Sequence, residues 1–166
     1  MKNYNCDKIE VLHMWIDYSK IADYQVVKEV VVGGLEWIGF SKVDTSKLLC
    51  ISSQMTSLID CCSGEYIQCD CDYDEESQIA YCDKLPDEEI EIAGQYGGKL
   101  PADSTQGEKI SIKTSENFIT TVTFSSVQGN ESIIFQNYGF YTCGFSYDGK
   151  YFVFAQDAGI SLLKRV

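Results

Sequence analysis

The chain of 166 residues contains a single histidine, His13, and only two prolines. One histidine cannot supply a multi-histidine metal site, and it leaves one imidazole as a candidate general base. His13 follows Leu12 and precedes Met14 in an apolar run, which favours a packed side chain over a catalytic one. Few prolines and 13 glycines are typical of many strands joined by tight turns.

Basic residues are also scarce, because 13 lysines and arginines stand against 25 acidic residues and the formal net charge is −12. Binding to nucleic acid or to an anionic membrane requires clusters of Lys and Arg, so we expect neither partner. No stretch approaches the roughly 20 apolar residues that a membrane-spanning helix needs. The N-terminal residues MKNYNCDKIE lack the apolar core of a secretory signal. We therefore expect a cytoplasmic protein.

What the sequence does contain is a series of short apolar runs separated by turn residues. The clearest is Gly33 to Glu65, where runs at Leu35–Phe40, 48–51 and 57–62 are divided by polar or glycine-containing turns. This pattern predicts an antiparallel meander. The chain is long enough for one β-rich domain with its own core. We predict an all-β fold in which antiparallel meanders form two blade-like sheets packed together, either as a partial β-propeller-like arrangement or as a sandwich.

Further strands are predicted from alternation and from β-branched or aromatic residues. Their ranges are 9–18, 24–32, 66–73, 88–95, 109–113, 119–125, 132–136, 140–145, 151–155 and 160–163. The first of these also fits helical spacing, and its aromatic and β-branched residues favour a strand. A turn is predicted at Leu85-Pro86-Asp87, and residues 96–107, rich in Gly, Pro, Asp, Ser and Thr, are predicted to form a loop.

A weak internal repeat relates residues 39–61 to residues 144–164. Both segments begin with Gly-Phe-Ser, continue through a polar turn that contains Lys, and then give an apolar run, a second turn and a closing strand. The repeat predicts two equivalent strand-turn-strand units within a single domain that covers residues 1–166.

Five segments carry a resemblance to a known family. They are GGLEWIGFS (33–41), LLCISS (48–53), IDCCSGE (59–65), IAGQYGGKLP (92–101) and GFSYDGKYFVFA (144–155). In their order and composition the chain resembles a widespread, uncharacterised family of small bacterial cytoplasmic proteins. The resemblance implies a bacterial β-rich fold and implies no particular activity.

The eight cysteines raise the question of a metal site or of disulfides. Five of them fall within 22 positions, at Cys61, Cys62, Cys69, Cys71 and Cys82. Their spacing differs from the paired C-x₂₋₄-C pattern of structural zinc sites, and adjacent cysteines on a strand face opposite sides. We expect reduced thiols that pack as small apolar side chains, with no metal and no cofactor.

The acidic residues from Asp70 to Glu76 alternate in a way that superficially resembles a calcium loop. The glycine expected at the sixth position and the glutamate expected at the twelfth are both absent, since Tyr81 occupies the latter. Gly94 to Gly98 is likewise not followed by the Lys-Ser or Lys-Thr of a phosphate loop. Neither motif predicts a ligand.

Three classes of function remain open on these grounds. The favoured one is a non-catalytic protein-binding module, because the chain is small and acidic and has no set of residues typical of a catalytic site. Its most specific form is an immunity-type inhibitor of a basic toxin. Its candidate partner-binding residues are Asp70, Asp72, Asp74, Glu75, Glu76 and Tyr96. The alternatives are a structural or regulatory β-domain, and an enzyme with a small-molecule cleft near residues 96–107. No sequence motif supports enzyme activity, and none assigns catalytic residues.

Overall fold

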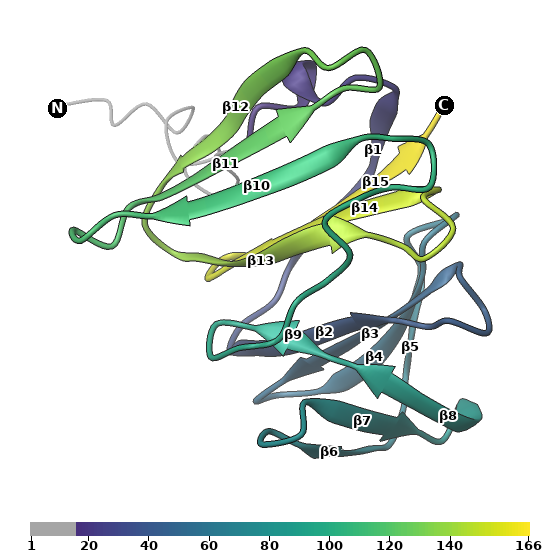
Figure 1. The fold of residues 1–166 in the computed structure, drawn as a ribbon. Helices are drawn as coiled ribbons and strands as arrows, with labels where there is room; N and C mark the ends of the chain where they lie inside the picture. The colour runs from purple at the N-terminus through teal and green to yellow at the C-terminus, as the bar shows by residue number, and fades with distance from the viewer. Residues whose placement is uncertain (1–15) are drawn as a thin grey trace, which may run out of the picture.

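The computed structural model describes residues 16–166, and these residues form an all-β protein with four antiparallel sheets (Figure 1). The five-stranded sheet has the order β5-β4-β3-β2-β9, and the four-stranded sheet has the order β1-β15-β14-β13. Two three-stranded sheets have the orders β6-β7-β8 and β10-β11-β12. The strand bounds are β1 Tyr24–Val31, β2 Leu35–Phe40, β3 Lys47–Ser52, β4 Thr56–Asp60, β5 Tyr66–Gln68, β6 Cys71–Asp74, β7 Ile79–Cys82, β8 Leu85–Glu91, β9 Ala93–Gly94, β10 Lys109–Thr114, β11 Thr120–Ser125, β12 Glu131–Asn137, β13 Phe140–Phe145, β14 Tyr151–Gln156 and β15 Gly159–Arg165.

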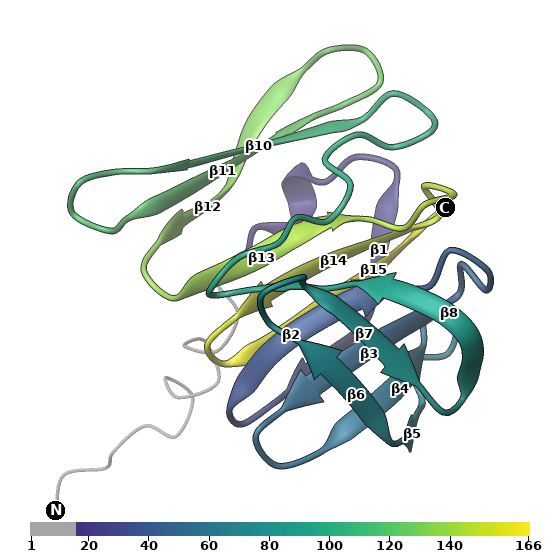
Figure 2. The same ribbon diagram turned by 60° about the horizontal axis from the view of Figure 1, so that its bottom comes forward.

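The four sheets are stacked as layers, and none closes into a barrel (Figures 1 and 2). The sheets β10–β12 and β6–β8 form the two outer layers. Between them lie the sheet that contains β13–β15 and the sheet that contains β2–β5. The first described strand, β1, pairs antiparallel with the last, β15, so both ends of the described chain complete one sheet.

Three separate apolar clusters fill the spaces between neighbouring layers. One contains Phe124 of β11 and Phe152 of β14, the second contains Leu48 of β3 and Leu162 of β15, and the third contains Leu49 of β3 and Ile90 of β8. Because the two central sheets are covered on both faces, their strands are apolar at consecutive positions, as every residue of β14 is buried. The outer sheets bury one face only, and the residues of β11 accordingly alternate in burial.

The all-β class predicted from the sequence is confirmed. The sequence predicted two packed sheets, whereas the described residues form four. Local patterns identify strands, but the number of sheets depends on where the chain leaves one sheet for the next. That choice is set by packing between residues far apart in the sequence.

Three local predictions are wrong. The single strand predicted over 88–95 is divided between β8 and β9, which belong to different sheets. The single strand predicted over 66–73 is interrupted at Cys69 and Asp70, so that β5 and β6 belong to different sheets. The turn predicted at Leu85-Pro86-Asp87 is instead the start of β8, an edge strand, where the missing N–H of proline breaks no ladder bond. The strand predicted over 9–18 lies largely outside the described residues, and its last residue, Tyr18, begins a short 3₁₀ turn, Tyr18–Lys20.

The two repeat segments, 39–61 and 144–164, have the same order of elements: a strand end, a turn, a strand, a turn and a closing strand. Gly39 and Gly144 occupy matching positions where another segment passes close by. A Cβ at Gly39 would lie 2.5 Å from the carbonyl oxygen of Glu91, and one at Gly144 would lie 2.5 Å from Cβ of Leu100. The first turns of the two segments also touch, because Thr45 Oγ1 donates to Asp148 Oδ2 at 2.8 Å.

Candidate functional site

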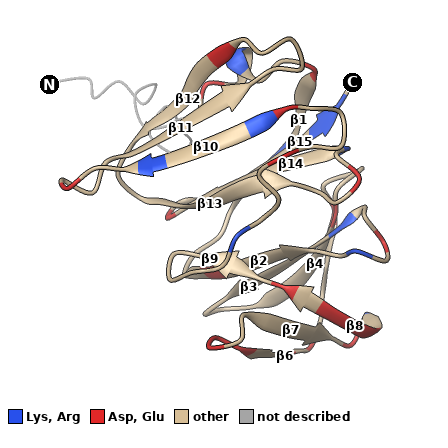
Figure 3. Cartoon of the chain, viewed as in Figure 1, with Lys and Arg blue, Asp and Glu red and all other residues tan. Residues whose placement is uncertain are grey.

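Acidic residues are concentrated in the outer sheet β6–β8 and its turns, residues 70–91, which we call the acidic sheet. This segment contains ten Asp and Glu residues and one lysine, Lys84, out of 25 acidic and 13 basic residues in the chain. Figure 3 shows the carboxylates along β8 and at the β6–β7 turn, whereas the basic residues lie mainly on other sheets and loops. One end of the layered stack is therefore strongly negative.

The two faces of the acidic sheet differ because successive side chains on a strand point to opposite sides. The inner face carries Ala80, Cys82 and Ile90, which belong to the third apolar cluster. The outer face carries Asp72 on β6 opposite Tyr81 on β7. The hydroxyl of Tyr81 donates to Glu89 Oε1 of β8 at 2.9 Å, so an exposed tyrosine lies between carboxylates of the two edge strands.

The β6–β7 turn adds three further carboxylates, those of Asp74, Glu75 and Glu76, all exposed. Asp74 accepts the backbone N–H of Glu76 at 3.1 Å, which fixes the turn. A hydrogen bond from the Ser77 hydroxyl holds the pKa of Asp74 below its usual value. The Asp74 carboxylate is therefore ionised at neutral pH.

The structure brings together five of the six residues singled out from the sequence. Asp70, Asp72 and Asp74 lie just before or within β6, and Glu75 and Glu76 lie in the adjoining turn. Tyr96 lies on the β9–β10 connection and is 78% exposed. The backbone of its loop approaches the β6–β7 region, since a Cβ on Gly97 would meet the Gln78 amide. Tyr96 thus lies beside the acidic sheet and not on its outer face.

Sequence reasoning did not single out the residues of β7 and β8 that complete this surface. The exposed members are Tyr81, Asp87, Glu89 and Glu91. The alternation of residues 88–91 placed these glutamates on a half-buried strand, yet nothing in the sequence indicated that this strand pairs with β7 and β7 with β6. The pairing of β6 with β7 and of β7 with β8 brings the acidic residues of these strands together on one surface.

Three cysteines of the acidic sheet and the residue before it lie close together on the inner face, and these are Cys69, Cys71 and Cys82. The Sγ atoms of Cys69 and Cys82 and a carboxylate oxygen of Asp83 all lie within 4.8 Å of one another. Cys71 is the cross-strand partner of Cys82. Burial raises the pKa of Cys69 to about 12 and that of Cys71 to about 11, so these groups are thiols and not thiolates at neutral pH when no metal is bound. The seven cysteines of the described residues are all free.

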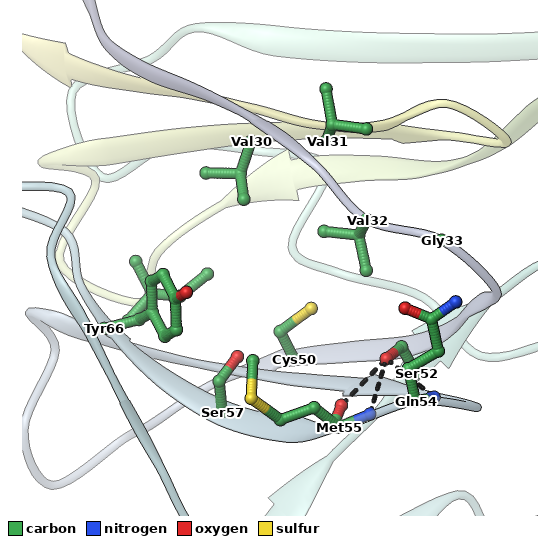
Figure 4. Close-up of a pocket in the computed structure, with 11 residues that line it drawn as sticks. Val30, Val31, Val32, Gly33, Cys50, Ser52, Gln54, Met55, Ser57 and Tyr66 are labelled. Atoms are coloured by element: carbon green, nitrogen blue, oxygen red, sulfur yellow. Dashed lines mark hydrogen bonds between the residues drawn. The ribbon is translucent and has the colours of Figure 1, made fainter.

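A small apolar pocket lies at the edge of the two central sheets, between the end of β1 and strands β3–β5 (Figure 4). Val30, Val32, Met55 and Tyr66 line it, and its volume is about 120 Å³. Pockets for small organic ligands usually have about 300–1,000 Å³. Cys50 also lines it, and burial raises the pKa of this thiol to about 12, which makes it a poor nucleophile at neutral pH. This pocket is too small and too inert to be an active site.

The segment 96–107 does border a wider recess, of about 540 Å³, with Ser77, Gln78 and Glu91 on the opposite wall. Glu91 is engaged by its neighbours, since Lys42 Nζ lies 3.2 Å from Oε2 and the Tyr147 hydroxyl donates to the same atom at 3.0 Å. These contacts lower the pKa of Glu91, so it is a weak base. The single histidine, His13, lies outside the described residues.

Two carboxylates of the described chain are buried, and both have structural partners. Glu88 accepts the Ser41 hydroxyl at 2.7 Å and the N–H groups of Lys42 and Val43 at 2.6 and 3.3 Å, so it ties β8 to the β2–β3 turn. Glu108 accepts hydrogen bonds from Arg165 and from the hydroxyl of Ser104. Such fully engaged carboxylates position turns and are unavailable for chemistry.

Comparison of the chain with family models, with curated proteins and with solved structures finds no match. The resemblance described from the sequence therefore stays a prediction. Within residues 16–166 there is no helix with the length and apolar character needed to cross a membrane.

Proposed function

We propose that this protein is a non-catalytic binding module whose outer acidic sheet recognises a basic partner protein, as an immunity-type inhibitor recognises a basic toxin. The observation that carries the proposal is the joining of residues 70–91 into one sheet, with ten acidic residues and one lysine, one face of which is free of the core. The carboxylates lie on a paired three-stranded scaffold, which holds them in fixed relative positions.

The chemistry of this surface supports a protein partner. Tyr81 is 51% exposed at the centre of the outer face, and tyrosine gives a large contact area at a low cost in side-chain entropy. The surrounding carboxylates would attract Lys and Arg side chains and accelerate association by electrostatic steering.

The proposal predicts a specific kinetic signature. Replacing Asp72, Asp74, Glu75 and Glu76 by Asn or Gln should slow association with the partner about tenfold at low salt and change dissociation much less. Added salt should slow the wild-type protein and remove most of this difference, because charges are screened over about 8 Å at physiological ionic strength. Stopped-flow or surface-based kinetics with a partner captured from the native host, identified by mass spectrometry and then purified, measure both rates.

A matched control changes the net charge equally at other sites. Neutralising the exposed residues Asp103, Glu116, Glu131 and Asp157 removes four carboxylates but leaves the acidic sheet intact. This variant should associate nearly as fast as the wild type. A partner that binds equally fast at low and high salt, or equal slowing by the two variants, would show that the acidic sheet is not the binding surface.

A further inference from the structure

The thiols on the inner face of the acidic sheet converge on one point beside a carboxylate. Cys69 lies just before β6 and Cys82 is the last residue of β7, with Asp83 directly after it. One ligand atom from each of these three residues lies within 4.8 Å of the other two. Sulfur atoms bound to one tetrahedral zinc ion at about 2.3 Å are separated by about 3.8 Å, so only a small closure is needed.

Cys71 provides a fourth donor at the same place. It is paired directly with Cys82 across the β6–β7 ladder, and side chains of directly paired residues lie on the same face of a sheet. Cys71 also packs against the apolar cluster that contains Cys69 and Cys82. Its Sγ lies 3.5 Å from the carbonyl oxygen of Asp72, and binding of an ion would require it to turn toward the other two sulfurs.

The backbone around the cluster is already fixed. The N–H of Asp70 donates to Asp83 Oδ1 at 3.0 Å, and the N–H of Asp83 donates to the carbonyl of Asp70 at 3.0 Å. The N–H of Cys69 donates to the carbonyl of Thr56 at 3.0 Å and so ties the cluster to β4. Hydrogen bonds of this kind hold metal ligands in position and contribute to metal affinity.

We propose that Cys69, Cys71, Cys82 and Asp83 bind one thiophilic divalent metal ion of the zinc class. Three sulfurs and one carboxylate oxygen suit Zn²⁺ in tetrahedral geometry, whereas Mg²⁺ and Ca²⁺ require oxygen ligands throughout. Core packing alone explains the buried thiols of Cys69 and Cys82. The observation that points to a metal ion is that a carboxylate oxygen of the exposed residue Asp83 lies within 4.8 Å of both sulfurs.

Three of the four proposed ligands border a recess that is open to solvent. A recess of about 490 Å³ is bordered by Asp70, Cys71, Asp72, Cys82 and Asp83, together with Tyr81. The negative charge of this recess raises the local concentration of cations. Binding converts the thiols into thiolates and releases their protons, which is the usual linkage at thiolate sites.

Cobalt(II) is the direct spectroscopic probe of this site. The full-length protein, reduced and freed of metal with a chelator, should bind one equivalent of Co²⁺ with the intense visible bands and the sulfur-to-cobalt charge-transfer band of a tetrahedral thiolate site. One equivalent of Zn²⁺ should bleach these bands. Substitutions C69S and C82S should each lower the affinity by more than about 100-fold, beyond the effect usual for residues that only orient ligands.

Cys62 supplies the matched control, since its thiol is exposed in the turn after β4 and lies away from the cluster. C62S should leave the spectrum and the stoichiometry unchanged. Because a serine at a buried position can destabilise the fold, X-ray absorption of the zinc-loaded wild type gives an independent measurement and should show three sulfur neighbours. The proposal is overturned by absence of a stoichiometric ion, by fewer than three sulfur neighbours, or by loss of binding in C62S.

Discussion

At the scale of single residues, Asp60 shows how one carboxylate stabilises a turn in two ways. Its Oδ2 lies 2.8 Å from Lys47 Nζ, and its Oδ1 accepts the N–H groups of Cys62 and Ser63 at 2.9 and 3.1 Å. The hydrogen bond from Lys47, followed by those from the turn backbone, lowers the pKa of Asp60 from 3.8 to about 2. The ionised form is therefore the one that the folded protein prefers.

The low pKa of Asp60 predicts that the substitution D60N lowers the free energy of unfolding by an amount that depends on pH. A carboxyl with a lowered folded pKa contributes stability that is complete above its unfolded value of 3.8 and is lost as the pH falls towards about 2. Since the carboxylate is about a third exposed, solvent screening reduces this contribution to about 1 kcal/mol at pH 7. Asn keeps the oxygen that the turn needs, so urea unfolding of D60N measures the loss of the ion pair with Lys47, both its charge and its hydrogen bond.

The control is D87N, which neutralises an exposed aspartate on β8 and should change the free energy of unfolding little at any pH. The difference between D60N and wild type should shrink steadily between about pH 4 and pH 2. An equal difference at pH 7 and at pH 2 would mean that the charge of Asp60 contributes nothing.

At the scale of elements, Gly39 and Gly144 test whether the two repeat segments are built alike. In both, an added Cβ would lie 2.5 Å from an atom of a neighbouring segment, the carbonyl oxygen of Glu91 at Gly39 and Cβ of Leu100 at Gly144. We expect G39A and G144A each to lower the free energy of unfolding by about 1–3 kcal/mol, the usual cost of overpacking a close contact. Denaturant unfolding at equilibrium provides the measurement.

Gly33 is the matched control for these two substitutions. A Cβ there would meet only the end of the flexible Gln54 side chain, at 3.1 Å, which can move aside. G33A should therefore change stability by less than about 0.5 kcal/mol. If G39A lowers the free energy of unfolding and G144A does not, the two glycines have different roles. The repeat would then be limited to the order of elements.

The elements also show how far sequence reasoning reaches. The meander from Leu35 to Asp60 could be predicted because apolar runs and turn residues mark its strands locally. The division of residues 66–73 between two sheets could not be predicted, because Cys69 and Asp70 continue the alternating pattern of a strand. Only the pairing of β6 with β7 separates this strand from β5. The same pairing brings Cys82 to Cys71 and Tyr81 to Asp72, so the acidic surface and the thiol cluster both depend on contacts that no local pattern encodes.

At the scale of the whole molecule, the layered architecture predicts unequal local stability. Strands β3 and β14 lie in the central sheets and are covered on both faces, whereas three of the four residues of β6 and five of the six residues of β10 are exposed. Opening an outer sheet uncovers one apolar cluster, while opening a central sheet uncovers two. Buried apolar area opposes local opening, so the outer sheets should open first.

Native-state hydrogen exchange read by mass spectrometry measures this gradient. Amides of β3 and β14 should exchange only through global unfolding, and those of β6 and β10 should exchange more than about 100-fold faster through local opening. Because β6 and β10 are hydrogen-bonded edge strands of separate sheets, fast exchange at both ends of the stack would reflect layering and not one weak segment. Equal protection in all four sheets would instead show that the three apolar clusters unfold as a single cooperative unit.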